Sequence, residues 1–333
     1  MSKTTKIDDL IKRLRAGNEA ALARMITLIE REDKHVPYIM EEINKDLGKA
    51  YTIGITGPPG AGKSTLTDKM TRLLRDQGFE VAIIAIDPSS PFTGGAVLGD
   101  RVRMESHYLD PGVFIRSLAT RGTHGGLSRS VQDAVKLCDA AGKDFILLET
   151  VGVGQTELDI IQVADSVQVV LVPESGDAIQ MLKAGLMEIA DVFVVNKADR
   201  DPSGAVAASL KSILQLKYNT TGGITRRGTA PIDHENLWYV PVLQTEGLTG
   251  VGVDKLLEEL DNHRKYLEKS GGLETRRKER LREELTNRLQ TQLIKKLQES
   301  ADHNPKVQAL IEQVVSGEAS SHSVTEQLIK EIL

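Results

Sequence analysis

The feature that most constrains this chain is a glycine-rich segment at positions 57–64. Its letters, Gly-Pro-Pro-Gly-Ala-Gly-Lys-Ser, satisfy the pattern Gly-x4-Gly-Lys-Ser. An apolar stretch that reads as a strand, Tyr51–Thr56, precedes it, and a helical pattern over Thr65–Gln77 follows it. A strand, a glycine loop and a helix in this order predict a phosphate-binding loop, because glycines let backbone N–H groups wrap phosphate oxygens beside a helix N-terminus.

The residues of this loop have separate predicted roles. We expect the Lys63 ammonium to reach the β- and γ-phosphates of a nucleotide and the Ser64 hydroxyl to ligate Mg²⁺. A chance glycine turn is the competing interpretation, and the flanking strand and helix argue against it. The predicted phosphate-loop contacts are Gly57, Pro58, Pro59, Gly60, Ala61, Gly62, Lys63, Ser64 and Thr65.

Apolar periodicity divides the chain into three parts. Residues 1–48 form a predicted N-terminal extension of two or three helices. Residues 49–262 alternate β-branched runs with helical segments, which predicts an α/β domain with a doubly wound, mostly parallel sheet of P-loop NTPase type. Residues 263–333 form a predicted C-terminal helical arm. The expected strands are Tyr51–Thr56, Val81–Ile86, Phe145–Leu148, Val167–Val172, Val192–Val195 and Tyr239–Leu243.

The arm carries Leu281, Leu285, Leu289 and Leu293 at i, i+4 spacing among charged residues. This stripe predicts either a face packed on the chain's own domain or a seam between two subunits. A narrow leucine seam on a heavily charged helix favours the subunit interface. Separately, glycines and a proline within residues 217–237 predict a surface loop before the last strand.

A second motif, Asn196-Lys197-Ala198-Asp199, predicts the base. It directly follows the expected strand Val192–Val195 and lies well beyond the phosphate loop in the sequence. The Asp199 carboxylate can accept hydrogen bonds from guanine N1–H and the 2-amino group, and adenine offers neither donor. We expect Asn196 to hold the loop and the Lys197 stem to pack over the base. Thr245 and Gly247, after the last expected strand, fit a loop that closes over guanine.

Acidic residues after two other strands predict a metal shell. Glu149-Thr150-Val151-Gly152 stands where GTPases usually carry Asp-x-x-Gly. We expect Glu149 to hold Mg²⁺, directly or through water, and the Gly152 amide to bond the γ-phosphate. Asp87 follows the second strand and can reach the same shell. Asp100 lies in a loop, where a surface pair with Arg101 is an equal alternative.

Two further expectations concern hydrolysis. Val153 stands where many GTPases carry a glutamine that orients water, and Gln155 cannot be assumed to replace it. We therefore expect Lys63, Glu149 and Gly152 to support slow intrinsic hydrolysis that speeds up when a partner completes the site. Arg101, Arg116 or Arg121 could supply a transition-state charge, and the letters alone do not decide between them.

Composition excludes some classes of function. The net charge is −5, from 42 basic and 47 acidic residues, which argues against a nucleic-acid binder. No apolar run reaches the length of a membrane-spanning helix. The single cysteine, Cys138, lies in an apolar helical context and is predicted to be a buried thiol. A cytoplasmic location is the expectation.

The motifs together resemble the methylmalonyl-CoA mutase-associated GTPases, a family formerly described as LAO/AO (lysine-arginine-ornithine) transport ATPases. The resemblance rests on residues 57–64, Asp-Pro-Ser-Ser-Pro at 87–91, Gly-Gly-x-x-Leu-Gly-Asp-Arg-x-Arg-Met at 94–104, Glu-Thr-Val-Gly-Val-Gly-Gln-Thr-Glu at 149–157, and Asn-Lys-Ala-Asp at 196–199.

The resemblance implies a homodimeric, Mg²⁺-dependent GTPase that cycles between GTP and GDP. It implies a chaperone of an adenosylcobalamin-dependent acyl-CoA mutase that gates cofactor loading by a cobalamin adenosyltransferase and protects the mutase. Carried over, the Mg²⁺ shell is Ser64, Asp87, Asp100 and Glu149. A further signalling loop falls at 174–183, with Asp177, Gln180 and Lys183 as its polar candidates; a helix start capped by Asp177 is the alternative.

Two other functions are open to a chain of this type. A metallochaperone GTPase for a nickel enzyme would favour a His-rich tract or Cys-x-Cys, and the sequence has neither. An ATP-driven transport ATPase or kinase is opposed by the Asn-Lys-Ala-Asp motif, because its aspartate selects guanine.

Overall fold

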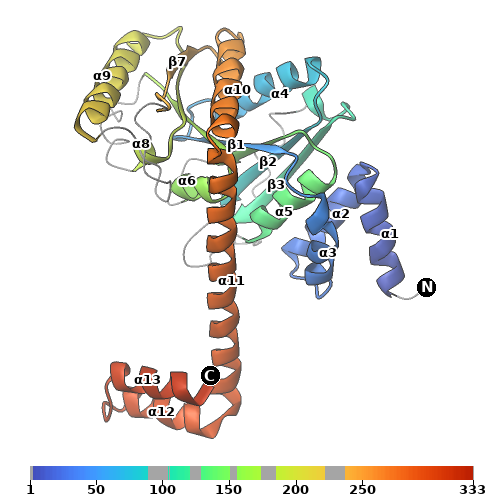
Figure 1. Cartoon of the computed structure of the whole chain (residues 1–333), viewed down its shortest axis with the longest axis vertical. Helices are drawn as coiled ribbons and strands as arrows, with labels where there is room; N and C mark the ends of the chain where they lie inside the picture. Colours follow the sequence, from blue (N-terminus) through green and yellow to red (C-terminus); the bar gives the residue numbers. More distant parts are fainter. Residues whose placement is uncertain are drawn as a thin grey trace. The chain divides into compact units, whose positions relative to one another are not determined.

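The computed structural model describes residues 3–88, 104, 106–120, 129–150, 156–173, 185–221 and 237–332. The chain forms two compact units, Met1–Arg276 and Arg277–Leu333. The first unit contains the sheet and every motif that the sequence predicts for nucleotide binding (Figure 1). The second unit is helical.

A seven-stranded sheet in the order β3-β2-β4-β1-β5-β6-β7 forms the centre of the first unit, and all its pairings are parallel. Parallel neighbours place the carboxyl ends of the strands along one edge, where α/β sheets bind ligands. The strands are β1 Tyr51–Thr56, β2 Val81–Pro88, β3 Val113–Thr120, β4 Phe145–Thr150, β5 Ser166–Leu171, β6 Val192–Asn196 and β7 Val242–Thr245.

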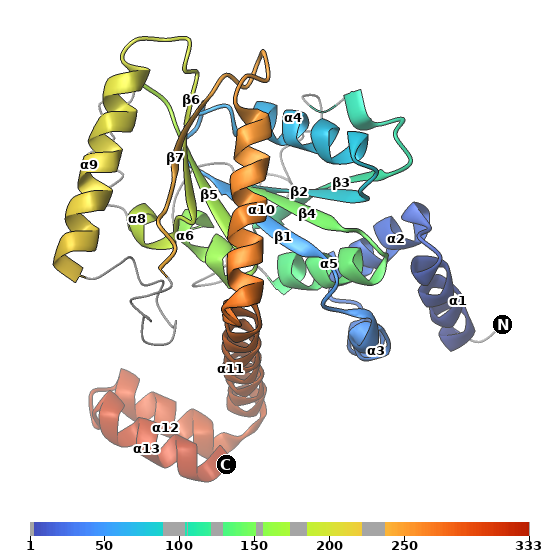
Figure 2. The same ribbon diagram turned by 45° about the horizontal axis from the view of Figure 1, so that its top comes forward.

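Helices cover both faces of the sheet. On one face, α4 (Lys63–Asp76) and α10 (Val253–Lys269) pack into the same apolar cluster (Figure 2). The other face carries the remaining helices of this unit. They are α1 Lys3–Arg15, α2 Glu19–Glu30, α3 Val36–Ile43, η1 Asn44–Asp46, α5 Arg129–Ala140, α6 Thr156–Asp159, η3 Ile160–Gln162, α8 Leu186–Ile189 and α9 Ser203–Thr221.

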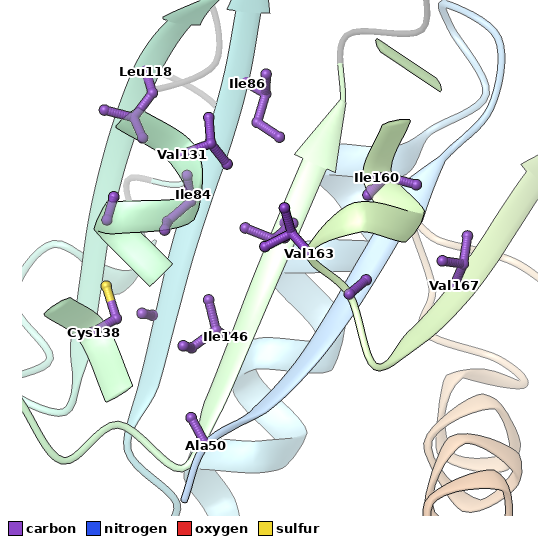
Figure 3. Packing of buried hydrophobic residues seen from close by; sticks show 14 of the residues in the cluster. Ala50, Ile84, Ile86, Leu118, Val131, Cys138, Ile146, Ile160, Val163 and Val167 are labelled. Carbon is purple, nitrogen blue, oxygen red and sulfur yellow. The ribbon is translucent and has the colours of Figure 1, made fainter. Parts of the chain in front are cut away.

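The core on this second face shows how the N-terminal helices join the domain. Val131 and Cys138 of α5 lie over Ile84 and Ile146 of the sheet (Figure 3). Helices α1, α2 and α3 add their apolar faces to this same cluster, so they pack on the domain through a continuous core. The side chain of Cys138 is fully buried, as the sequence predicted.

The structure corrects three details of the predicted elements. A seventh strand, β3, lies at the edge of the sheet and was not among the expected strands. The last strand covers Val242–Thr245 rather than Tyr239–Leu243. Helix α9 continues through Thr221, so the first residues of the expected 217–237 loop are helical.

The second unit contains most of α11 (Gly272–His303), followed by α12 (Pro305–Val315) and α13 (Ser321–Ile332). The first residues of α11, up to Arg276, belong to the first unit. Leu281, Leu285, Leu289 and Leu293 of α11 have between 45% and 59% of their surface exposed. Among the residues that the structure describes in this unit, the leucine stripe is left exposed. Across the described ranges, no helix combines the length and the apolar character needed to span a membrane.

Candidate nucleotide site

Four predicted motifs meet at the carboxyl edge of the sheet. The phosphate loop leaves β1 at Thr56, and β4 ends with Glu149 and Thr150. The base motif begins with Asn196, the last residue of β6, which lies beside Thr245 at the end of β7. Ile55 of β1 is in register with Glu149 of β4. Strand pairing therefore brings these motifs to one place although they are far apart in the sequence.

Two glycines fix the path of the phosphate loop. Gly57 has φ +138°, and a Cβ there would lie 2.0 Å from the Val170 carbonyl oxygen of β5. Gly62 has φ +86°, and its Cβ would lie 2.3 Å from Asn196 Nδ2. Neither position can hold a side chain in this conformation, because the backbone region is strained for L-residues and the space is filled. The loop is therefore packed directly against β5 and the base motif.

Lys63, the first residue of α4, lies within the loop. Its buried ammonium donates to the carbonyl oxygens of Gly57, at 2.8 Å, and Pro58, at 3.0 Å. Lysine carries three donors, and a phosphate oxygen accepts such bonds strongly. The charge is thus already at the place where a phosphate group would bind.

A hydroxyl–carboxylate cluster lies behind the loop. Ser64 Oγ donates to Glu149 Oε1 at 2.5 Å, and Thr67 Oγ1 lies 3.2 Å from Glu149 Oε2. All three side chains are buried. Serine and carboxylate oxygens are hard donors of the kind that Mg²⁺ prefers, so Ser64 and Glu149 fit the predicted ion. Thr67 was not predicted, although its position one turn after Ser64 on the same helix is a usable signal.

Asn196 connects the base motif to two neighbouring loops. Its Nδ2 donates to the Ala61 carbonyl oxygen at 2.8 Å. Its Oδ1 accepts from the Gly247 amide at 2.9 Å and from Thr245 Oγ1 at 3.1 Å. The predicted contacts Thr245 and Gly247 therefore hold Asn196 in place.

The rest of the base motif has a constrained backbone and an open side chain. Lys197 adopts φ +58°, which is uncommon for a residue with a Cβ and is found at binding sites that store local strain. The Ala198 amide donates to the Thr245 carbonyl oxygen at 3.0 Å, and this bond fixes the turn. Asp199 is exposed, so its carboxylate is accessible to a base.

The remaining predicted site residues lie on the next strand end or outside the described ranges. Asp87 is placed by its backbone alone, one residue beyond the point where Ile86 of β2 pairs with Thr150 of β4. The described residues contain no cluster of three or more His, Cys, Asp or Glu able to hold a metal ion. Five predicted residues lie outside the described ranges, namely Asp100, Gly152, Asp177, Gln180 and Lys183.

The structure also locates one of the three arginines that were considered as a source of transition-state charge. Arg116 lies in the middle of β3, where its guanidinium pairs with the Glu30 carboxylate of α2. Helix α2 packs on the face opposite α4, so Arg116 is engaged away from the phosphate loop. Arg101 and Arg121 are outside the described ranges.

A partly buried carboxyl group was not singled out by sequence reasoning. Glu157 belongs to α6, directly after the Glu149 segment, and burial raises its pKa while the nearby Lys63 charge lowers it. Because the Lys63 charge acts on the Glu157 carboxyl, Glu157 contributes to the electrostatic environment of the phosphate loop.

Residues 22–302 match a family model described as "Methylmalonyl Co-A mutase-associated GTPase MeaB". The chain belongs to the MeaB family. A relative from Pyrococcus horikoshii that is named as a GTPase is 44% identical over 98% of both chains. GTPase ArgK of Escherichia coli is 35% identical over 89% of this chain and 88% of its own.

Two further comparisons extend the relationship. The mouse protein named "Methylmalonic aciduria type A homolog, mitochondrial" is 29% identical, over 97% of this chain and 79% of its own. A crystal structure named "LAO/AO transport system kinase" is 26% identical, with a TM-score of 0.71 over 100% of this chain and 99% of its own. This MeaB-family protein is thus a P-loop GTPase that hydrolyses GTP, as its motifs predicted.

Proposed function

We propose that the MeaB-family site binds GTP and Mg²⁺ through the residues that the sequence predicted. The proposal rests above all on Asn196, whose side chain bonds the phosphate loop and the Thr245–Gly247 segment at once. A nucleotide that contacts these loops would be held by its phosphates and its base together. In this proposal Lys63 contacts the β- and γ-phosphates, and Asp199 accepts from guanine.

The proposed metal site is built on Ser64 and Glu149, with Asp87 and Asp100 contributing from the next strand end and its loop. Mg²⁺ bound there would neutralise negative charge that develops on the phosphate oxygens. The chain's own contribution is to orient its oxygen ligands. The Ser64 hydroxyl donates to Glu149, and the Thr67 hydroxyl, which also lies 2.9 Å from the Lys63 carbonyl oxygen, is 3.2 Å from the same carboxylate. The Gly152 amide is the proposed γ-phosphate contact.

Competition between nucleotides tests the assignment of the base. We expect GTP and GDP to bind at least about a hundredfold more tightly than ATP and ADP, because adenine would cover the Asp199 carboxylate without offering it a hydrogen-bond donor. Asp199→Asn should shift the preference toward xanthosine triphosphate, whose C2 carbonyl accepts from an amide. Unchanged preference for GTP in this variant would reject the assignment, and Asp201→Asn, in the following turn, is the matched control.

We further propose that this GTPase is a chaperone of an adenosylcobalamin-dependent acyl-CoA mutase of the methylmalonyl-CoA type. The support is the family description and the relationship to the mouse relative, which covers 97% of this chain and 79% of the mouse protein. In such a role the γ-phosphate would order loops that contact the mutase and release them after hydrolysis. The 174–183 segment with Asp177, Gln180 and Lys183 is the proposed signalling loop, and a cobalamin adenosyltransferase is the proposed second partner.

Co-purification tests the partner. Tagged chain is mixed with a candidate cobalamin-dependent acyl-CoA mutase in GDP or in a non-hydrolysable GTP analogue, with Lys63→Ala as the nucleotide-blind control. We expect a complex whose affinity differs between the two nucleotides in the wild type and not in the variant. Single-turnover assays should show slow hydrolysis alone and faster hydrolysis with the mutase. A fast lone enzyme would reject the second expectation.

A homodimer formed through the arm is the remaining part of the proposal. The exposed leucines of α11 form a stripe that a second copy can cover. Leu285→Asp combined with Leu289→Asp should lower the mass measured by light scattering to that of one chain. Asn287→Asp, exposed on the same helix but outside the stripe, is the control and should leave the mass unchanged.

A further inference from the structure

A groove of about 400 Å³ runs between the second half of α4 and α10. Tyr51 and Phe145, the first residues of β1 and β4, form part of its floor. These positions are at the amino ends of the strands, whereas the nucleotide motifs are at the carboxyl ends. The groove is therefore separate from the nucleotide site. Its volume lies in the range of pockets that bind ligands or a few side chains of a partner.

The floor of the groove is aromatic and already holds a planar cation. The rings of Phe79 and Phe145 meet edge to face, with centroids 5.0 Å apart. The guanidinium carbon of Arg264 lies 5.1 Å from the centre of the Tyr51 ring and 6.0 Å from that of Phe145. Aromatic faces attract cations in this geometry, and Arg264 already occupies that position, so the floor offers an incoming partner mainly apolar surface.

The α10 wall of the groove is negatively charged at one end. Arg264 is neutralised by Glu268 at 2.9 Å, and Asp261 by Lys265 at 2.6 Å. Asp254 and Glu258 also line the groove, and both are exposed. Within the part of the chain that the structure describes, neither has an ion-pair partner within 4.0 Å. The groove therefore combines an apolar floor with two exposed carboxylates about one helical turn apart, of which Glu258 interacts with the Lys265 charge beyond ion-pair distance.

We propose that this groove is a docking site for a basic, amphipathic segment of a partner protein. Apolar side chains of the segment lie over Phe79, Phe145 and Leu257, and a lysine or arginine lies beside Asp254 and Glu258. Charge complementarity selects this occupant, since acidic peptides and nucleic acids meet like charges at the same end. The site does not depend on the proposed mutase role, and it can be tested without a mutase.

The probe is a fluorescein-labelled synthetic peptide of leucine, alanine and arginine with helical spacing, titrated with the full-length protein and followed by anisotropy. A second peptide carries glutamate in place of arginine. We expect saturable binding of the first peptide alone. Asp254→Lys combined with Glu258→Lys should weaken it roughly tenfold or more and allow the glutamate peptide to bind instead.

The control is Glu259→Lys, which changes the same charge on the same helix outside the groove lining. It should alter affinity less than about twofold, and the thermal melting of all variants should match the wild type. Equal weakening by Glu259→Lys would mean non-specific attraction and would overturn the proposal, as would the absence of saturable binding. A changed molecular mass in the double variant would assign the groove to a second copy, which also overturns it.

Discussion

The Asn196 side-chain amide donates to the Ala61 carbonyl oxygen at 2.8 Å, across 135 positions of sequence. Asn196 is the last residue of β6, and Ala61 lies inside the phosphate loop. One side chain therefore links the segment proposed to read the base with the segment proposed to hold the phosphates. Because the same side chain also accepts from Thr245 and Gly247, three loops share one buried hydrogen-bond centre.

Replacing Asn196 with alanine should uncouple these loops. The variant leaves the Ala61 carbonyl and the Gly247 amide without their partner, and each unpaired buried group costs about 1–3 kcal/mol. We expect GDP affinity to fall roughly tenfold to a hundredfold, measured by displacement of a fluorescent guanine nucleotide. Asn196→Asp keeps the acceptor for Gly247 and Thr245 but loses the donor to Ala61. Its GDP affinity should therefore lie between those of the wild type and the alanine variant. Wild-type affinity in the alanine variant would contradict this account.

Gly62→Ala should impair nucleotide binding more than Gly60→Ala. Both glycines have positive φ, +86° and +75°, so alanine costs about 1 kcal/mol of backbone strain at either position. Only at Gly62 does the added Cβ meet a neighbour, Asn196 Nδ2 at 2.3 Å, while Gly60 faces open space. Comparing the two variants separates the effect of backbone strain, which both share, from the effect of the steric clash, which only Gly62→Ala has. Equal losses of GDP affinity in the two variants would exclude the collision as the cause.

Thr67→Val should weaken the dependence on Mg²⁺ without abolishing nucleotide binding. The substitution keeps the shape of the side chain and removes the hydroxyl 3.2 Å from Glu149 Oε2. Glu149 then keeps Ser64 as its described hydroxyl partner and is less well oriented. We expect the Mg²⁺ concentration that half-maximally slows GDP release to rise about threefold to tenfold. Thr67→Ser restores the hydroxyl and should restore the wild-type value; failure to do so would assign the effect to packing.

The part of the site that could be predicted consists of motifs whose residues are adjacent in the sequence. The phosphate loop and the base motif each consist of neighbouring residues after an apolar strand, and parallel pairing brings all such ends to one edge. The contact between Thr67 and Glu149 spans 82 positions, and no local pattern encodes it. It depends on where α4 lies over β4, which is a property of tertiary packing.

The edge strand β3 was not predicted from the sequence, because its apolar pattern is interrupted. Its sequence, Val-Phe-Ile-Arg-Ser-Leu-Ala-Thr, interrupts an apolar run with Arg116 and Ser117. A central parallel strand is buried on both faces and reads as continuously apolar, whereas an edge strand admits polar residues. Arg116 therefore resembled a site residue in the sequence, and only the packing of α2 reveals its partner, Glu30.

Cys138 should resist thiol reagents in the folded protein. Its side chain is fully buried on α5, and burial raises the pKa of the thiol from 9.0 to about 12. A raised pKa lowers the fraction of reactive thiolate, and burial also blocks access of the reagent. We expect labelling by a disulfide reagent at mildly alkaline pH to require denaturant, after which one thiol per chain reacts. Rapid labelling of the native protein would show that α5 opens readily.

Asp110 should make stability sensitive to acid through Arg75. The Arg75 guanidinium donates to both Asp110 oxygens, at 2.9 to 3.2 Å, and these bonds hold the pKa of the carboxyl below its ordinary value of 3.8. A lowered folded-state pKa means that the stabilisation is fully present above the ordinary value and disappears as the pH falls through the lower one.

Asp110→Asn should therefore lower Tm at neutral pH by roughly 2–4 °C, a modest loss because the pair is partly exposed to solvent. The difference from the wild type should begin to shrink below about pH 4, where the carboxyl of the unfolded chain takes up a proton, and should disappear once the pH falls below the lower pKa of the folded protein. Scanning calorimetry at several pH values measures this, with Asp76→Asn, an exposed carboxylate at the end of α4, as the control. If the Asp110→Asn deficit stayed constant into acid, the loss would come from altered packing of the turn, because removal of the charge would no longer explain it.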